Sequence, residues 1–155
     1  MQKSNTNSII IRNIIKQDLD QILSIDSQVA RDPWTEKIFS DCISMYNGIV
    51  AVTDQKIVGY GIIAIYTSIN EAHVLNLAVD PLWQRRGIAS KLLDNLINYN
   101  SASNNKTVIF LESSKNNLAA INLYKKFNFT ESYIRKNYYS TKYGKEDAIV
   151  FKRDF

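Results

Sequence analysis

The sequence predicts a mixed α/β domain, in which helices flank both faces of a layered sheet. Three observations support this prediction. Apolar residues recur at a period of two in some segments and at the helical period in others. The nine-residue run Val58–Tyr66 is apolar on both faces of an expected strand, which indicates that the sheet is covered on each side. A strand, a helix and a second strand follow one another over 73–112, which predicts one parallel pair.

The expected elements follow from these periods in chain order. They are a strand over 8–14, helices over 18–29 and after Thr35, strands over 49–53, 56–66 and 73–79, a helix over 88–100, a strand over 107–112, a helix over 118–127, and strands over about 129–137 and 146–153. Thr35 is a good N-cap residue. The short polar connection of Asp54 and Gln55 predicts a hairpin. The helix after Thr35 is expected to bury Ile38, Phe39, Cys42, Ile43 and Tyr46.

Length and composition predict one domain over 8–155, preceded by a polar tail, 1–7, that we expect to be disordered. A chain of 155 residues can bury a core without covalent cross-links. The lone Cys42 excludes a disulfide framework and a zinc site made of cysteines. The longest apolar run is too short to span a bilayer, and residues 1–12 lack a signal-peptide pattern. We therefore expect a cytoplasmic protein with no membrane partner.

The charge of the chain raises the question of a nucleic-acid partner. Its 19 Lys and Arg residues outnumber 15 Asp and Glu residues, for a net charge of +4. Basic patches attract phosphate polymers, but here the lysines are scattered and form no run of five or six. We therefore expect no direct nucleic-acid partner, and the sequence leaves the oligomeric state open.

The predicted parallel strands share one sheet edge at their carboxyl ends, where open α/β sheets bind ligands. The turn Gln84–Ala89 opens the helix between them, and the unpaired N–H groups and dipole of a helix N-terminus favour a phosphate. Gly87 and Ala89 let a pyrophosphate approach the backbone closely, and Arg85 and Arg86 add positive charge. The alternative is an ordinary turn with solvated arginines.

A carboxylate and a phenol follow in the same stretch of chain. Glu112 ends the second parallel strand on the face of Val108 and Phe110, so alternation directs its side chain to a core-facing position. It is either a general base or a solvated edge residue. Asn117 and Tyr124 are seven residues apart on the next helix, close to one helical face. Tyr124 taken alone is an ordinary core aromatic, but its convergence with the phosphate turn and the carboxylate favours a catalytic site.

Other chemistries find little support in the sequence. His73 is the single histidine and begins its strand, away from the ligand edge, so we interpret it as structural and exclude a Ser-His-Asp triad. The segment Gly59–Ala64 fits G-x-G-x-x-A but lies inside an expected strand, which excludes a dinucleotide-binding turn. Without clustered His, Cys or Asp residues, we expect no metal.

The segments Leu75–Pro81 and Gln84–Ala89 resemble the acetyl-CoA signature of the GNAT superfamily, whose core is Q/R-x-x-G-x-G/A. The family fold is a mixed, mostly antiparallel sheet with a central parallel pair and helices on both faces, which agrees with the expected element order. From about residue 8 to the end, narrower features resemble RimI-type N-terminal alanine acetyltransferases of a small-subunit ribosomal protein. These features are Pro33–Lys37, Phe110–Glu112 with Tyr124 twelve residues later, Arg135–Tyr139 and Gly144–Ile149.

The resemblance implies that acetyl-CoA is the cosubstrate and that the N-terminal α-amine of a ribosomal protein is the acceptor. It also implies that Glu112 is the general base and Tyr124 the general acid. Tyr138 and Tyr139 fall in a late loop that helps to hold the acceptor peptide in such enzymes. The implied coenzyme-binding residues are Leu77, Ala78, Val79, Arg85, Arg86, Gly87, Ile88, Ala89, Ser90 and Asn117.

The sequence departs from the family pattern at two places. Ser113–Asn116 replaces a more usual Val-Arg-x-Ser type of sequence, which changes the coenzyme contacts expected there. Asn128 stands where the family usually has Gly, but Asn tolerates the left-handed conformation, so we expect the turn to form.

Two alternative functions remain open at this point. One is a GNAT enzyme that acetylates a small-molecule amine or a protein lysine, for which acidic acceptor-site residues are expected. The late loop offers Glu146 and Asp147. The other is a non-catalytic module that senses the coenzyme or binds the ribosome. The presence of both Glu112 and Tyr124 argues against this second alternative.

Overall fold

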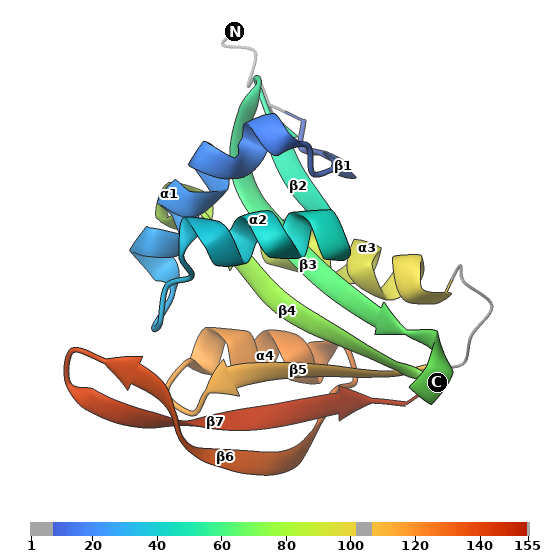
Figure 1. The fold of residues 1–155 in the computed structure, drawn as a ribbon, viewed down its shortest axis with the longest axis vertical. Helices are drawn as coiled ribbons and strands as arrows, with labels where there is room; N and C mark the ends of the chain where they lie inside the picture. Colours follow the sequence, from blue (N-terminus) through green and yellow to red (C-terminus); the bar gives the residue numbers. More distant parts are fainter. Residues whose placement is uncertain (1–7, 102–106, 155) are drawn as a thin grey trace, which may run out of the picture.

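The computed structural model describes residues 8–101 and 107–154, so the predicted tail 1–7 lies outside the described residues. Its central feature is one seven-stranded sheet with the strand order β1-β2-β3-β4-β5-β7-β6 (Figure 1). All neighbouring strands are antiparallel apart from β4 and β5. The predicted sheet with one parallel pair is therefore confirmed. The strands are β1 (Ile10–Asn13), β2 (Asn47–Thr53), β3 (Lys56–Tyr66), β4 (Glu71–Val79), β5 (Val108–Ser114), β6 (Thr130–Thr141) and β7 (Gly144–Arg153).

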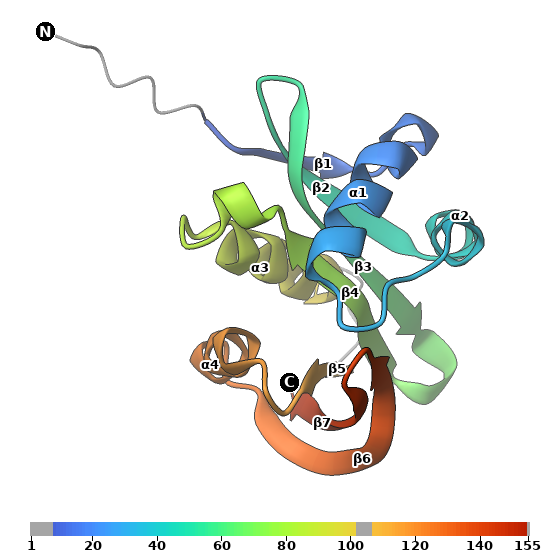
Figure 2. The same cartoon turned by 90° about the vertical axis from the view of Figure 1, so that its left-hand side faces the viewer.

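Helices cover both faces of this sheet, as predicted (Figure 2). Helices α1 (Leu19–Val29) and α2 (Glu36–Met45) pack on one face, and α3 (Ile88–Ser101) and α4 (Leu118–Lys126) on the other. Each face has its own core, built around Ile22, Phe39 and Tyr60 on the first and Leu92, Leu96, Ile109 and Phe151 on the second. Short 3₁₀ turns lie at Lys16–Asp18, Thr67–Ile69 and Pro81–Trp83. In the described ranges, no helix has the length and apolar character needed to cross a membrane.

Three local predictions are confirmed in detail. Asp54 and Gln55 both have positive φ angles, of 47° and 62°, which suits the twist of a two-residue hairpin between β2 and β3. Thr35 caps α2, since its Oγ1 accepts a hydrogen bond of 3.2 Å from the Ile38 N–H. Asn128 has a φ of 65° just after α4, so it adopts the left-handed conformation in place of a glycine.

The predicted buried stripe of α2 is narrower than expected. Phe39 is fully buried between Trp34 and Tyr60, with ring centroids 4.9 and 5.7 Å away. Ile38 is 42% exposed, because it is rotated by about 100° from Phe39 around the helix axis. Tyr46 lies beyond the last turn as the C-cap residue. Phe39 is therefore the fully buried residue of the helix, and Cys42 and Ile43 are half-buried beside it.

The late hairpin also differs from the prediction. Tyr138 and Tyr139 belong to β6, which continues to Thr141, and are not in a loop. A β-bulge allows this extension, because Arg135 pairs with Ala148 while Tyr139 pairs with Glu146, so three residues of β6 oppose one of β7. The bulge contains Asn137, whose φ is 53°. A strand predicted from periodicity alone stops at such an interruption, although the hydrogen-bonded pairing of β6 with β7 resumes beyond it.

The parallel pairing of β4 with β5 is short. It runs from Glu71 opposite Val108 to His73 opposite Phe110 and then stops. Just beyond, β4 is bulged against β3, since Ile62 and Ile63 pair with Asn76 and Val74 and leave Leu75 without a partner there. The two strands then diverge (Figure 1), β4 continuing along β3 and β5 along β7.

Candidate active site

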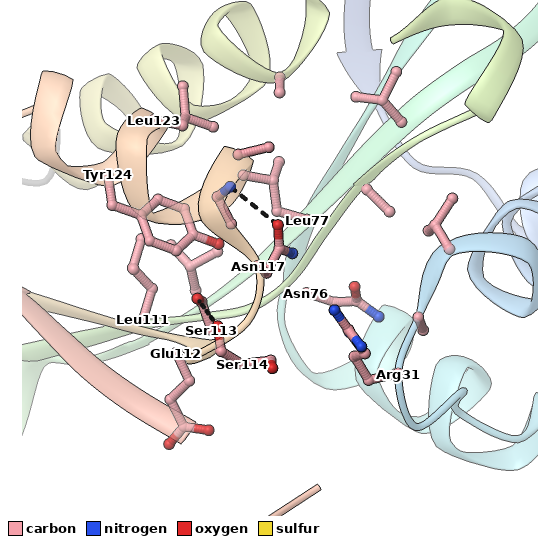
Figure 3. Close-up of a pocket in the computed structure, with 18 of the residues that line it drawn as sticks. Arg31, Asn76, Leu77, Leu111, Glu112, Ser113, Ser114, Asn117, Leu123 and Tyr124 are labelled. Carbon is pink, nitrogen blue, oxygen red and sulfur yellow. Dashed lines mark hydrogen bonds between the residues drawn. The ribbon is translucent and has the colours of Figure 1, made fainter. Parts of the chain in front are cut away.

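A cleft of about 1550 Å³ lies where β4 and β5 diverge. Its walls come from the segment between α1 and α2, from β4 and β5, from the start of α3, and from α4 and β6 (Figure 3). Most of the site residues predicted from the sequence line this cleft. They are Leu77, Ala78, Val79, Arg85, Gly87, Ile88, Ala89, Ser90, Glu112, Asn117, Tyr124, Tyr138 and Tyr139.

The opening turn of α3 forms one end of the cleft. The Lys91 N–H donates the first helical hydrogen bond, of 3.1 Å to the Gly87 carbonyl, so the N–H groups of residues 88–90 precede the helical ladder. Gly87 has a φ of +80°, and a Cβ there would meet no atom within 4 Å. Open space next to unpaired N–H groups at the positive end of a helix suits a phosphate.

The two arginines of this turn have different environments. Arg85 adopts a positive φ of 61° and lines the cleft. Arg86 lies outside the cleft lining, contrary to the expectation that both flank a pyrophosphate. Its guanidinium is 4.6 Å from the centre of the Trp83 ring, and it donates a 3.4 Å hydrogen bond to the Leu82 carbonyl. This cation–π contact holds Arg86 against the 3₁₀ turn after β4.

Helix α4 brings a phenol to the cleft. Asn117 is the N-cap of α4, not a residue on it as predicted, and its Oδ1 accepts a 3.2 Å hydrogen bond from the Ala120 N–H. The Tyr124 ring packs against Phe129 and Phe151, while its hydroxyl points toward Leu77 (Figure 3). Burial raises the pKa of Tyr124 to about 12. The phenol is therefore protonated at neutral pH and able to donate a proton.

Glu112 reaches the cleft from the other face of β5. Ile109, Leu111 and Ser113 form the buried face of this strand, against α4. Glu112 shares the half-buried face with Phe110. The prediction that its side chain takes a core-facing position is therefore wrong. Its Oε1 accepts a 2.7 Å hydrogen bond from the Arg135 guanidinium. The carboxylate and the Tyr124 phenol thus lie on opposite faces of the sheet, and both line the cleft.

A buried carboxylate that sequence reasoning missed supports the α1 and α2 side of the cleft. Asp26 is 1% exposed and accepts hydrogen bonds from the Tyr60 hydroxyl (2.7 Å), the Asn76 amide (3.2 Å) and the Trp34 N–H (2.8 Å). Burial, and then the charge of Asp26, raise the pKa of Tyr60. Asp26 thereby ties α1 to β3, to β4 and to the segment before α2. An acidic residue in an amphipathic helix gives no sequence signal of such a role.

A second network crosses the cleft. Arg31, between α1 and α2, forms a 3.2 Å ion pair with Glu146 of β7. Glu146 also accepts hydrogen bonds from the Ser114 hydroxyl (2.8 Å) and the Asn116 amide (3.3 Å), and the Ser114 bond is the main cause of its lowered pKa. Asp147 of β7 is likewise paired, with the Lys136 ammonium at 3.1 Å. Both acidic residues considered for an amine acceptor are therefore already compensated.

His73 lines the cleft, although the sequence places it away from the ligand edge. It stacks on Phe110, with ring centroids 5.2 Å apart, and its Nε2 is 2.9 Å from a Glu71 carboxylate oxygen. The stack joins the last paired residues of β4 and β5, whereas the contact with Glu71 stays within β4. Within the described part of the chain, no group of three or more His, Cys, Asp or Glu residues is arranged to hold a metal ion.

Residues 16–129 match the family model of the acetyltransferase (GNAT) family. The chain belongs to the GNAT family. The GNAT relatives include the "[Ribosomal protein bS18]-alanine N-acetyltransferase" of Salmonella typhimurium, which is 35% identical over 86% of this chain and 88% of that protein. The Escherichia coli protein of the same name is 34% identical over 90% of this chain and 93% of that protein.

Solved GNAT structures share the fold. The crystal structure of the ribosomal-protein-S18-alanine N-acetyltransferase from Escherichia coli has a TM-score of 0.87, at 32% identity, and the match covers 95% of this chain and 94% of that chain. Arabidopsis thaliana NAA60 in complex with acetyl-CoA also has a TM-score of 0.87, at 18% identity, and the match covers 96% of this chain and 99% of that chain. At that identity the likeness shows the fold alone.

The hydrogen bonds of Asp26 lead to a stability prediction. Asp26→Ala leaves the Tyr60 hydroxyl and the Trp34 N–H without their buried partner. We expect the free energy of unfolding, measured by urea denaturation, to fall by about 3 kcal/mol. Tyr60→Phe completes a double-mutant cycle. It should lower the free energy of unfolding by less in the Asp26→Ala background than in the wild type. Equal costs in both backgrounds would contradict a shared network.

Proposed function

We propose that this GNAT protein transfers the acetyl group of acetyl-CoA to the N-terminal α-amine of a protein. The proposed acceptor is the one that the relatives' names give, the alanine N-terminus of the small-subunit ribosomal protein bS18, in the cytoplasm. The observation that carries the proposal is a single cleft lined by the opening turn of α3, by Glu112 and by Tyr124. The relatives' identity of 34–35% over 86–90% of the chain supports the choice of acceptor.

The cleft offers suitable partners for the pyrophosphate, the pantetheine arm and the thioester of acetyl-CoA. The N–H groups of residues 88–90 and the Arg85 side chain would hold the pyrophosphate. The Asn117 side chain would contribute a polar contact beside α4. Residues 77–79 lie beyond the last residue of β4 that pairs with β5, so their backbone could pair with the pantetheine arm on that side, where the Gln84 amide donates a 3.1 Å hydrogen bond to the Val79 carbonyl. The same backbone would orient the thioester carbonyl and stabilise its developing negative charge.

Glu112 and Tyr124 would handle the protons of the transfer. An α-amine has a pKa of about 8, so roughly a tenth of it is neutral at pH 7. Glu112, directly or through water, would take a proton from the acceptor ammonium. Tyr124 would donate its phenolic proton to the departing thiolate. A lysine amine, with a pKa of about 10.4, requires about two more units of deprotonation, which favours the α-amine.

The reaction itself can be tested with a peptide panel and mass spectrometry. Peptides that begin with Ala, Ser or Met, and one with a blocked terminus and an internal Lys, are incubated with acetyl-CoA and the full chain. We expect acetylation at the free α-amine, strongest for the Ala peptide. Acetylation of the blocked peptide at Lys would instead support the lysine alternative. A panel without any product, together with acetyl-CoA binding detected by calorimetry, would support the non-catalytic module.

Replacing Glu112 tests the general base. Glu112→Gln keeps the shape of the side chain but removes its proton-accepting charge. We expect the turnover number to fall about 100-fold at pH 7, with a smaller change in acetyl-CoA affinity. The loss should shrink at higher pH, because more of the acceptor amine is already neutral. Steady-state rates from pH 6 to 9 and calorimetric Kd values check this. Wild-type rates across that range would remove Glu112 from the role.

Replacing Tyr124 tests the general acid. Tyr124→Phe keeps the ring packed against Phe129 and Phe151 while it removes the hydroxyl. We expect turnover to fall about tenfold or more with an unchanged Kd for acetyl-CoA. Tyr143→Phe is the matched control, because Tyr143 is 87% exposed in the turn of the late hairpin. Weaker coenzyme binding with intact turnover would show that the Tyr124 hydroxyl binds the coenzyme and does not act as the acid.

A further inference from the structure

The Glu112 carboxylate has a cationic partner from a distant part of the chain. The Arg135 guanidinium, on β6, lies 2.7 Å from Glu112 Oε1, and the two side chains are 42% and 27% exposed. The same guanidinium lies 3.8 Å from the centre of the Tyr138 ring. Arg135 is therefore held on one side by a carboxylate and on the other by an aromatic face.

The sheet register explains how this contact forms. Arg135 pairs with Ala148 of β7, and Ala148 pairs in turn with Ser114 of β5, so the Arg135 side chain reaches across β7 to Glu112. The small Ala148 side chain, on the face that Arg135 crosses, leaves room for this path.

The β6 bulge begins directly after Arg135 and brings Tyr138 against the guanidinium. Asp147 fixes this bulge by accepting a 3.0 Å hydrogen bond from the Asn137 N–H. The backbone of β6 thus presents Arg135 and Tyr138 as one preassembled unit.

We propose that Arg135 is the positioning residue for Glu112: it fixes the carboxylate at the β5 wall of the cleft while acetyl transfer runs. This inference rests on the proposed function of Glu112 as the base. A carboxylate that has rotated away from the acceptor ammonium cannot accept a proton from it. Arginine suits this task because its guanidinium stays charged at every working pH and binds carboxylates with a fixed geometry.

The other groups around Glu112 do not supply this charge. On β7 its register partner is the apolar Val150. From β6, Tyr138 and Tyr139 face it, and the pKa of each is raised, first by burial and then by the Glu112 charge. On the β4 side, His73 stacks on Phe110, two residues before Glu112.

The carboxylate of Glu112 stabilises the charged form of Arg135. Its own pKa is raised, chiefly by the hydrogen bond to Glu112. In the described ranges, Arg135 is the cation in contact with Glu112.

The experiment compares Arg135→Gln, Arg135→Lys and the wild type, with Lys136→Gln as the matched control. Lys136 is the next residue of β6 and carries the same charge, but it pairs with Asp147 and lies outside the cleft lining. The first measurement is the split between kcat and KM with acetyl-CoA and a free N-terminal peptide. We expect Arg135→Gln to lower kcat about tenfold, with a smaller change in KM and in the calorimetric Kd for acetyl-CoA, because the carboxylate loses its fixed position while the cleft keeps its shape. Arg135→Lys should restore part of the lost kcat, and Lys136→Gln should stay close to the wild type.

The second measurement places Arg135→Gln in the Glu112→Gln background, where no carboxylate is left to position. Arg135→Gln should cause little further loss of kcat there. An unchanged kcat in Arg135→Gln, or an equal loss in Lys136→Gln, overturns the inference. Wild-type activity of Glu112→Gln overturns the proposed base, whereas a loss in Glu112→Gln with wild-type activity of Arg135→Gln overturns the positioning role alone, so the two failures are distinguishable.

Discussion

The site depends on the early end of the parallel pairing between β4 and β5. Backbone N–H and C=O groups inside a sheet normally find partners on both neighbouring strands. Here β5 leaves β4 after His73 and Phe110, while β4 goes on for six more residues along β3. The backbone of β4 therefore has a sheet edge in the middle of the molecule. An extended ligand arm with amide groups is the natural partner for such an edge.

The divergence also determines which elements meet in the cleft. Helix α3 follows β4 and begins at the end of the cleft, whereas α4 follows β5 and starts from its opposite wall. Had the ladder continued, the side chains of Leu77 and Glu112 would belong to adjacent paired strands, without space between them. The bulge at Leu75 and the aromatic stack of His73 on Phe110 mark the point where the paired part ends.

Local patterns in the sequence predicted most of the fold and the part of the candidate site that lies in one continuous stretch of chain. Periodicity gave the order of the strands and helices, and the β-α-β stretch gave the parallel pair and the helix-opening turn near Gly87. The left-handed Asn128 followed from a property of one residue type. Contacts between distant parts of the chain gave no such signal. The burial of Asp26 and the pairing of Arg31 with Glu146, 115 residues away, depend on the folded arrangement.

Most carboxylates of the cleft already have partners. Glu112 is paired with Arg135, Glu146 is paired with Arg31, and Asp26 accepts three hydrogen bonds from neutral groups, while Asp32 also lines the cleft. A site for a polycationic small molecule needs several carboxylates that are free to bind it. This cleft instead offers mainly partnered carboxylates, neutral polar groups and aromatic rings, which suits an extended peptide whose charge is concentrated in one terminal ammonium.

The proposed acid and base lie on opposite faces of β5, and this separation has a chemical consequence. Each of the two side chains has its own partners in the resting protein. Tyr124 lies among Phe129 and Phe151, where burial keeps it neutral, and Glu112 lies beside the Arg135 guanidinium. In the proposed reaction the two groups act on one substrate from opposite faces of β5, in the cleft between the diverging strands.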